Sequence, residues 1–367
     1  MPTRAFLVAF ILSVSATAGV GASGGADEPY YFYHARPYGS ESLVGPTRMI
    51  TNGGFGILQL ENRSNQLDEI EWGNGWANLW KNLLNPVTAI EEKGWWDFFS
   101  SEVIPISING GDAQYWPNYM NHLIGGGMGY RNMREWFRHH GFEHERRWAL
   151  ATLTVYHFLN EVVEMHDKTS WRVDPIADMY IFNVAGVLAF ENDGIARFFG
   201  ETLSMRDWSF QPFYDPRHGS LENVGQNYTV RLRLGETTPW HLFYHWGNSG
   251  ELGVSRELRG GHFLSAGAGF VAKNLEDVDG ISETVNLATS FGLFWDREGS
   301  LMASLLYAKE KDYRYRLNVY PGVLKIGPLR PALTFISARN NDFLAGVTLG
   351  NWPLLPVGLG SRVGNDR

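Results

Sequence analysis

The fold is decided by the stretch Val285-Asn286-Leu287-Ala288-Thr289-Ser290-Phe291-Gly292-Leu293-Phe294-Trp295. Its odd-numbered positions are mostly large and apolar, whereas its even-numbered positions are mostly small or polar. The segment Tyr313–Tyr320 repeats the alternation, with tyrosine, leucine and valine on one side and arginine and asparagine on the other. A period of two places alternate side chains on opposite faces of an extended chain. Both stretches therefore predict β-strands with one apolar and one polar face.

Similar runs recur between residues 220 and 350, separated by turn sequences such as Gly247-Asn248-Ser249-Gly250 and Gly260-Gly261. We expect about eight strands, the number found in the smallest membrane barrels. An apolar outside with a polar inside is typical of a lipid-embedded barrel. A soluble barrel would have the same alternation with its apolar face inward. The sequence predicts an α+β protein, with a small antiparallel β-barrel of the outer membrane over residues 201–352 and a tail at 353–367.

The first residues predict export. Arg4 provides a positive charge before the apolar stretch Ala5–Ala18, which is too short to span a bilayer comfortably. Val20-Gly21-Ala22 offers small residues for cleavage, so we expect a signal peptide over residues 1–22. The chain has no cysteine, which excludes disulfides and a lipoprotein anchor. These features favour a bacterial envelope protein.

Composition narrows the class of partner. A net charge of −8 and a pI near 5.8 disfavour nucleic acid. The 14 Trp, 16 Tyr and 22 Phe are typical of a protein with aromatic girdles at membrane interfaces. No stretch beyond the signal is long and apolar enough for a conventional transmembrane helix. We therefore expect membrane lipid, or a lipid-linked glycan, as the partner and no cofactor.

The sequence predicts a helical module over residues 116–200. The preceding segment, residues 23–115, is expected to be rich in loops and aromatic residues. The three helices of the module should cover residues 117–137, 145–165 and 174–199. The first contains the glycines of Gly125–Gly129, and glycine lowers helix propensity. Close approach of a neighbouring helix would explain why Gly125 and Gly129 are there.

The second helix contains a polar stripe in an otherwise apolar sequence. His157, Glu161 and Glu164 are separated by four and three residues, which places them on one face. In the third helix Asp174 and Asp178 share a face by the same spacing. These residues are the main candidates for chemistry in the chain.

Two further residues are candidates for binding. His122 on the first helix could face the same interior as the stripe. Asn183, five residues after Asp178, should lie on the opposite side of an α-helix. We therefore predict that Asp174, Asp178 and Asn183 do not all belong to one cluster.

This set of residues allows three interpretations. Imidazole and carboxylates bind Zn, Mn or Fe, so the set could be a metal site, with the metal undetermined. It could instead be an acid–base site in which His157 is the general base and Glu161 or Asp178 orients it. The third interpretation is a polar network that holds three helices in register. The sequence lacks the His-Glu-x-x-His metal motif and the Gly-x-Ser-x-Gly nucleophile elbow.

The order His122, Glu161, Arg172-Val173-Asp174, Asp178, Asn183 and Gly186 resembles the pattern of the VanZ-like family. Proteins of that family are membrane-embedded and associated with glycopeptide resistance. Tyr119–Tyr130, Asn160–Glu164 and Asp174–Asp178 are also similar to an uncharacterised family of bacterial envelope proteins with a domain of unknown function. The second resemblance implies a place in the envelope and no particular activity.

From these observations we predict an outer-membrane-associated envelope protein with a structural or a lipid- or glycan-handling role. A first alternative is an envelope hydrolase acting on a lipid or a lipid-linked head group. A second alternative is a soluble periplasmic barrel that binds a small ligand.

Overall fold

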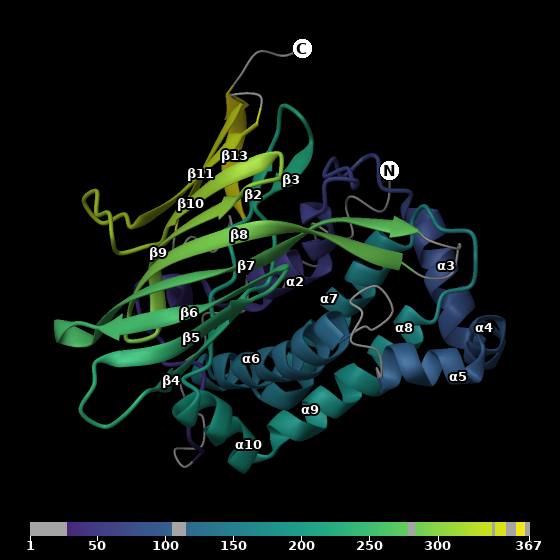
Figure 1. Ribbon diagram of the computed structural model, residues 1–367, viewed down its shortest axis with the longest axis horizontal. Coiled ribbons are helices and arrows are strands. Elements are labelled where there is room, and N and C mark those ends of the chain that lie inside the picture. Colours follow the sequence, from purple (N-terminus) through teal and green to yellow (C-terminus); the bar gives the residue numbers. More distant parts are fainter. Residues whose placement is uncertain (1–27, 105–114, 278–282, 340–341, 350–356, 364–367) are drawn as a thin grey trace.

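The computed structural model describes residues 28–104, 115–277, 283–339, 342–349 and 357–363. In these ranges the helices gather on one side of the molecule and a large, strongly twisted sheet lies on the other (Figure 1). The predicted signal peptide, residues 1–22, lies outside the described residues.

The helical layer begins earlier in the chain than the sequence predicts. Residues 23–115, expected to be rich in loops, contain α2 (Pro46–Gly54), α3 (Trp72–Leu84) and α4 (Pro86–Lys93). Proline begins α2 and α4, where its missing N–H costs no helical hydrogen bond. The shorter elements of this part are η1 (Ser40–Leu43), η2 (Gly56–Gln59), α5 (Trp95–Phe98) and the π-helical η3 (Phe99–Val103).

The predicted helical module contains more elements than three. Its first helix is a π-helix, η4 (Tyr115–Gly126), that continues as α6 (Gly127–His139). Its second is confirmed as α7 (Glu145–Glu164). The third breaks at Asn192, whose backbone is extended and whose side chain accepts hydrogen bonds from the first turn of a new helix. Its parts are α8 (Asp174–Ala177), η5 (Asp178–Phe182), α9 (Asn183–Glu191), α10 (Asp193–Arg197) and η6 (Phe198–Thr202), of which η5 and η6 are π-helical.

In the described part of the chain, the strands form one sheet of 13 strands in the order β1-β4-β5-β6-β7-β8-β9-β10-β11-β12-β13-β2-β3. All neighbours are antiparallel except β13 and β2, which are parallel. The strands are β1 (Arg206–Asp207), β2 (Phe213–Asp215), β3 (Ser220–Glu222), β4 (Tyr228–Arg233), β5 (Trp240–Trp246), β6 (Ser249–Glu257), β7 (His262–Asp277), β8 (Glu283–Arg297), β9 (Ser300–Ala308), β10 (Tyr313–Val319), β11 (Pro331–Ala338), β12 (Phe343–Leu349) and β13 (Gly358–Val363). The 3-10 turn η7 (Arg259–Gly261) joins β6 to β7.

The predicted antiparallel barrel of about eight strands is wrong, because the sheet is open and mixed. The expected runs correspond to β4–β12, but β13 adds a strand within the predicted tail and β1–β3 add three short ones. On one side the sheet ends at β1, and on the other β13 pairs with β2 and β2 with β3. No ladder between the two ends closes the described strands into a barrel.

The two faces of the sheet differ in polarity. Strand pairing aligns apolar positions into rows across the outer face, which we define as the side that bears Leu252 and Leu293, 58% and 56% exposed. One such row is Leu232, Leu242, Val254, Ala266, Leu293, Leu305, Leu317, Phe335 and Ala345, each paired with the next. The inner face is the other side. It bears buried polar residues that include Ser255, Ser265, Ser304, Asn318 and Thr334.

Segments from before the sheet pack on its inner side. From α2, Arg48 Nε donates to Phe210 O at 3.2 Å, and Asn52 Nδ2 donates to the same oxygen at 3.0 Å. Asn52 also accepts a hydrogen bond from the N–H of Gly225 at 2.8 Å. These side-chain bonds satisfy backbone groups that lie outside the strand ladders. The fold thereby fixes α2 between the sheet and α7.

Glycines let the elements around η4 approach closely. A Cβ on Gly127 would lie 2.7 Å from the carbonyl oxygen of Gly186 on α9. The expected helix–helix contact holds for Gly129, whose Cβ would lie 2.7 Å from Met49 of α2. It is wrong for Gly125, which lies against Tyr228 of β4 and so makes a helix–sheet contact.

Within the described ranges, no helix combines the length and the apolar character needed to cross a membrane.

Candidate functional site

His122 lies at the centre of a polar cluster between η4, α7, η5 and α9. Its Nε2 is 2.9 Å from Oδ2 of Asp178, and its Nδ1 is 3.1 Å from Oδ1 of Asn183. Burial lowers the pKa of His122, but the negative charge of Asp178 and the hydrogen bonds to Asp178 and Asn183 outweigh that effect and raise it. The ring is therefore suited to donate from both nitrogens as an imidazolium.

The prediction that Asn183 lies away from Asp178 is wrong, and the reason is local. Asp178 begins the π-helical turn η5, in which the N–H of Asn183 donates to the carbonyl of Asp178, five residues earlier. Such a turn brings residues five apart towards one face, whereas an α-helix separates them. Both side chains consequently reach His122.

His157 of α7 stacks beside His122, with ring centroids 5.0 Å apart and an interplanar angle of 28°. Its side chain is 3% exposed, and its Nε2 has no hydrogen-bond partner among the described residues. Burial and, second, the positive charge of His122 lower the pKa of His157 well below the usual value. His157 is therefore neutral at physiological pH, with one ring nitrogen unpaired.

Three carboxyl groups meet next to the histidines. One oxygen each from Glu161, Asp174 and Asp178 lies within 4.8 Å of the others. Glu161 is 1% exposed, and neither of its oxygens has a hydrogen-bond partner in the described part of the chain. Burial first, and then neighbouring carboxylates, raise the pKa of Glu161 and that of Asp174 well above their usual values. Without a compensating cation, both groups tend to be protonated.

The structure brings together all the candidates that the sequence identified. Glu164 lies one turn after Glu161 on α7, and its negative charge is among the causes that raise the pKa of Glu161 and of Asp174. The polar stripe of α7 therefore faces the aspartates of α8 and η5. Sequence spacing identified the stripe correctly, and tertiary packing adds His122 and Asn183 to it.

A second buried polar group, on the inner sheet face, was not identified from the sequence. Both oxygens of Glu251 are bonded: Oε2 by His245 Nδ1 at 2.7 Å and Ser249 Oγ at 3.0 Å, and Oε1 by Ser290 Oγ at 2.7 Å. The sequence does contain a signal for this group, because its polar residues occupy inward-facing positions in strands whose polarity alternates. Because every carboxylate oxygen is satisfied, it has the character of a structural network.

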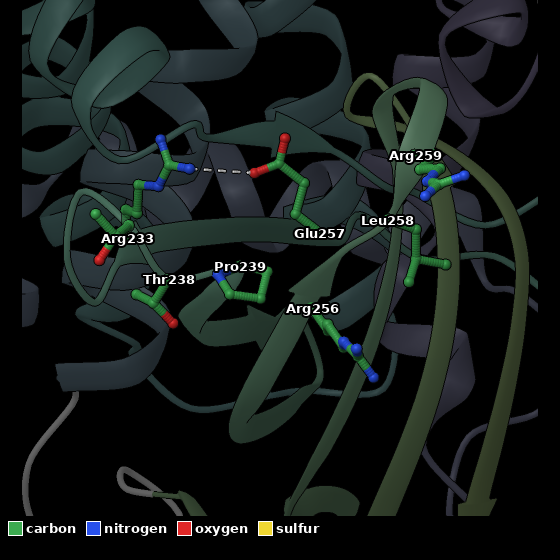
Figure 2. A pocket seen from close by; sticks show the side chains of 8 residues that line it. Arg233, Thr238, Pro239, Arg256, Glu257, Leu258 and Arg259 are labelled. Carbon is green, nitrogen blue, oxygen red and sulfur yellow. Dashed lines mark ion pairs between the residues drawn. The ribbon is translucent and has the colours of Figure 1, made fainter.

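An arginine-rich depression lies at one end of the strands. It has a volume of about 480 Å³ and is lined by the β4–β5 hairpin and the end of β6. Figure 2 shows Arg233 paired with Glu257, an ion pair of 3.6 Å, with Arg256 and Arg259 nearby. Arg256 also lies over the ring of Trp240 at 5.5 Å. Arg256 belongs to the outer face, two residues after Val254, whereas Arg233 and Glu257 alternate with the outer-face residues of their strands and lie on the other side.

Comparisons of the chain with models of protein families, with curated proteins and with solved structures give no match. The function is therefore inferred from the structure and the sequence.

Proposed function

We propose that this is an envelope protein of the outer membrane that contacts lipid through its outer sheet face and handles a lipid or a lipid-linked glycan. The observation that carries the proposal is the set of exposed apolar rows on the strands. Leu287, 61% exposed, and Phe270, 59% exposed, belong to the same face as Leu252 and Leu293. Soluble monomers rarely expose a contiguous apolar surface of this extent, whereas acyl chains favour it.

The short edges of the sheet support contact with lipid. Backbone groups left unpaired in hydrocarbon cost several kcal/mol each, so a long free edge would oppose the proposal. The edge strands β1 and β3 have only 2 and 3 residues. The N–H of Leu221 in β3 also donates to Asn65 O at 2.9 Å, outside the ladder. β1 covers only Tyr228 and Thr229 of β4, and beyond it the N–H of Arg231 donates to Leu203 O at 2.7 Å. β2 covers only Gly358 and Leu359 of β13, and beyond it the N–H of Arg362 donates to Asp215 Oδ2 at 2.9 Å.

The arginines at the strand ends support an anionic head group as the polar part of the ligand. Arg256, which lines the depression of Figure 2, pairs in register with Trp240, next to the Leu242–Val254 pair of the apolar row. Tryptophan and arginine are favoured at the boundary between acyl chains and head groups. Each basic residue near an anionic surface contributes about 1 kcal/mol.

Vesicle flotation of the purified full chain tests this proposal. The wild type should float with phosphatidylglycerol vesicles, and the double variant Leu252→Asp/Leu293→Asp should lose most of that binding. Ile326→Asp is the matched control, because Ile326 is 66% exposed but lies in the loop after β10. Wild-type chain that stays in the soluble fraction, or a folded double variant that floats fully, would contradict the proposal.

An envelope hydrolase acting on a lipid-linked head group is the second candidate. The observation that favours it is His157, whose Nε2 is buried, unpaired among the described residues and adjacent to carboxyl groups. A neutral imidazole can accept a proton from water. His157→Gln should then abolish the envelope phenotype at an unchanged melting temperature. Retention of both the phenotype and the melting temperature would leave His157 with a structural role only.

A further inference from the structure

The carboxyl cluster contrasts with the buried carboxylates of Glu251 and Asp296 in how its oxygens are satisfied. Glu251 has protein donors on both oxygens, and Asp296 accepts two hydrogen bonds from Arg231. Glu161 has none on either oxygen, and Oδ1 of Asp178 has none, among the described residues. Buried polar groups are almost always hydrogen-bonded, and buried charges are paired or bind metals. The buried oxygens of Glu161 and Asp178 are therefore available to bind a ligand.

The position of Asp178 indicates where that ligand would bind. His122 Nε2 contacts Oδ2 of Asp178, and His122 Nδ1 contacts Oδ1 of Asn183. Oδ1 of Asp178 has no hydrogen-bond partner among the described residues, and one oxygen of Asp178 lies within 4.8 Å of oxygens of Glu161 and Asp174. Ligands of metal ions are commonly fixed in this way by a second hydrogen-bonded residue.

We propose that Glu161, Asp174 and Asp178 bind a hard divalent cation of the Mg²⁺, Mn²⁺ or Ca²⁺ class. Glu161 comes from α7, and Asp174 and Asp178 come from the continuous helical segment α8–η5, so the cation would join α7 to that segment. Carboxylate oxygens are the protein ligands that this class of cation prefers. Among the described residues the group contains no imidazole nitrogen, which disfavours zinc.

A bound cation would also reduce the repulsion between the carboxylates of the cluster. Glu161, Asp174 and Asp178 are close together, with Glu164 nearby and His122 paired to Asp178. Carboxylate groups this close together repel one another when they are charged. A divalent cation would supply two positive charges and occupy the unpaired oxygens at once. This proposal does not rest on contact of the sheet with lipid, and it holds whether or not the site is catalytic.

Titration of the purified full chain with Mn²⁺, followed by the electron paramagnetic resonance signal of the free ion, tests the site. The wild type should bind one Mn²⁺ saturably. Glu161→Gln should weaken binding at least tenfold, and His122→Gln should weaken it about tenfold, because loss of an orienting partner typically costs 10–100-fold. Mg²⁺ and Ca²⁺ added as competitors would show which cation the site prefers.

Glu251→Gln is the matched control, since Glu251 is equally buried but lies in a satisfied network on the sheet. It should bind Mn²⁺ like the wild type. If Glu161→Gln fails to fold by circular dichroism, the less buried Asp174→Asn replaces it in the test. Absence of saturable Mn²⁺ binding by the wild type, or wild-type affinity in a folded Glu161→Gln or Asp174→Asn protein, would overturn the proposal.

Discussion

His122 Nε2 lies 2.9 Å from Asp178 Oδ2, and this ion pair joins the π-helix η4 to the π-helical turn η5. π-Helical turns are rare, and they occur frequently at functional sites. The turn η5 begins at Asp178 and brings the side chain of Asn183, five residues later, towards the same face, so that both residues reach His122. A regular α-helix would direct Asn183 away from Asp178.

We predict that His122→Gln lowers the free energy of unfolding by about 3 kcal/mol, because it leaves the buried Asp178 carboxylate without its cation. Asp178→Asn in the same chain should restore part of the loss, since the two amides can bond without charge. Urea unfolding of the wild type, both single variants and the double variant, with a chelator present, measures the coupling. Costs that add to within about 0.5 kcal/mol would show that the pair is not coupled.

The polarity of the strand faces could be predicted from the sequence because side-chain direction is a local property. Alternation in Val285–Trp295 and Tyr313–Tyr320 depends only on the extended backbone, and the structure places Leu293 and Leu317 on the outer face and Ser290 and Asn318 inward. Whether a sheet closes depends on strand number, tilt and pairing of its ends, which are non-local. Strands of two or three residues, such as β1–β3, are also too short to show a period.

The candidate site could be predicted only in part, because some of its residues follow α-helical spacing and others do not. The stripe His157, Glu161 and Glu164 follows α-helical spacing, and α7 is a regular helix. Asn183 was placed on the wrong side, because the sequence was read with 3.6 residues per turn through a segment that is π-helical. No residue pattern in the segment 178–182 distinguishes a π-turn from an α-turn.

Gly127→Ala should destabilise the protein by about 1–3 kcal/mol, because the new Cβ would lie 2.4 Å from the ring of Phe190 and 2.7 Å from Gly186 O. Gly73→Ala is the control. Gly73 lies in α3 with no atom within 4 Å of the added Cβ, so this change should stabilise by up to about 1 kcal/mol. Thermal unfolding compares the two. A Gly127→Ala protein that is as stable as Gly73→Ala would show that α6 and α9 can separate freely.

Arg231→Lys should cost about 2–3 kcal/mol, although it keeps the positive charge. The guanidinium donates two bonds to Asp296, at 2.9 and 3.0 Å, and lies 4.0 Å from the ring of Phe263. Lysine cannot reproduce that fork, and both partners of the pair are buried. Arg233→Lys is the matched control, because its pair with Glu257 is exposed and should contribute less than about 1 kcal/mol. Equal melting temperatures for the two variants would contradict the prediction.

Lys311 should make stability rise with pH in the alkaline range. Its Nζ donates to the carbonyls of Gln59 and Ala272, both at 2.9 Å, and its side chain is buried. Burial first, and then the charge of Arg316, lower the pKa of Lys311 to about 8, whereas the unfolded chain keeps its usual value of 10.5. Between these values the unfolded state binds more protons than the folded state, so the free energy of unfolding increases with pH.

The measurement is urea unfolding of the wild type and Lys311→Met at several values between pH 7 and pH 10. The stability of the wild type relative to the variant should be constant below pH 8 and should then rise by about 1 kcal/mol per pH unit. Taking the difference removes tyrosines and other groups that titrate equally in both proteins. Lys309→Met is the control, since the Lys309 side chain is 68% exposed, and its curve should run parallel to that of the wild type. A parallel curve for Lys311→Met as well would show that Lys311 stays protonated in the folded protein.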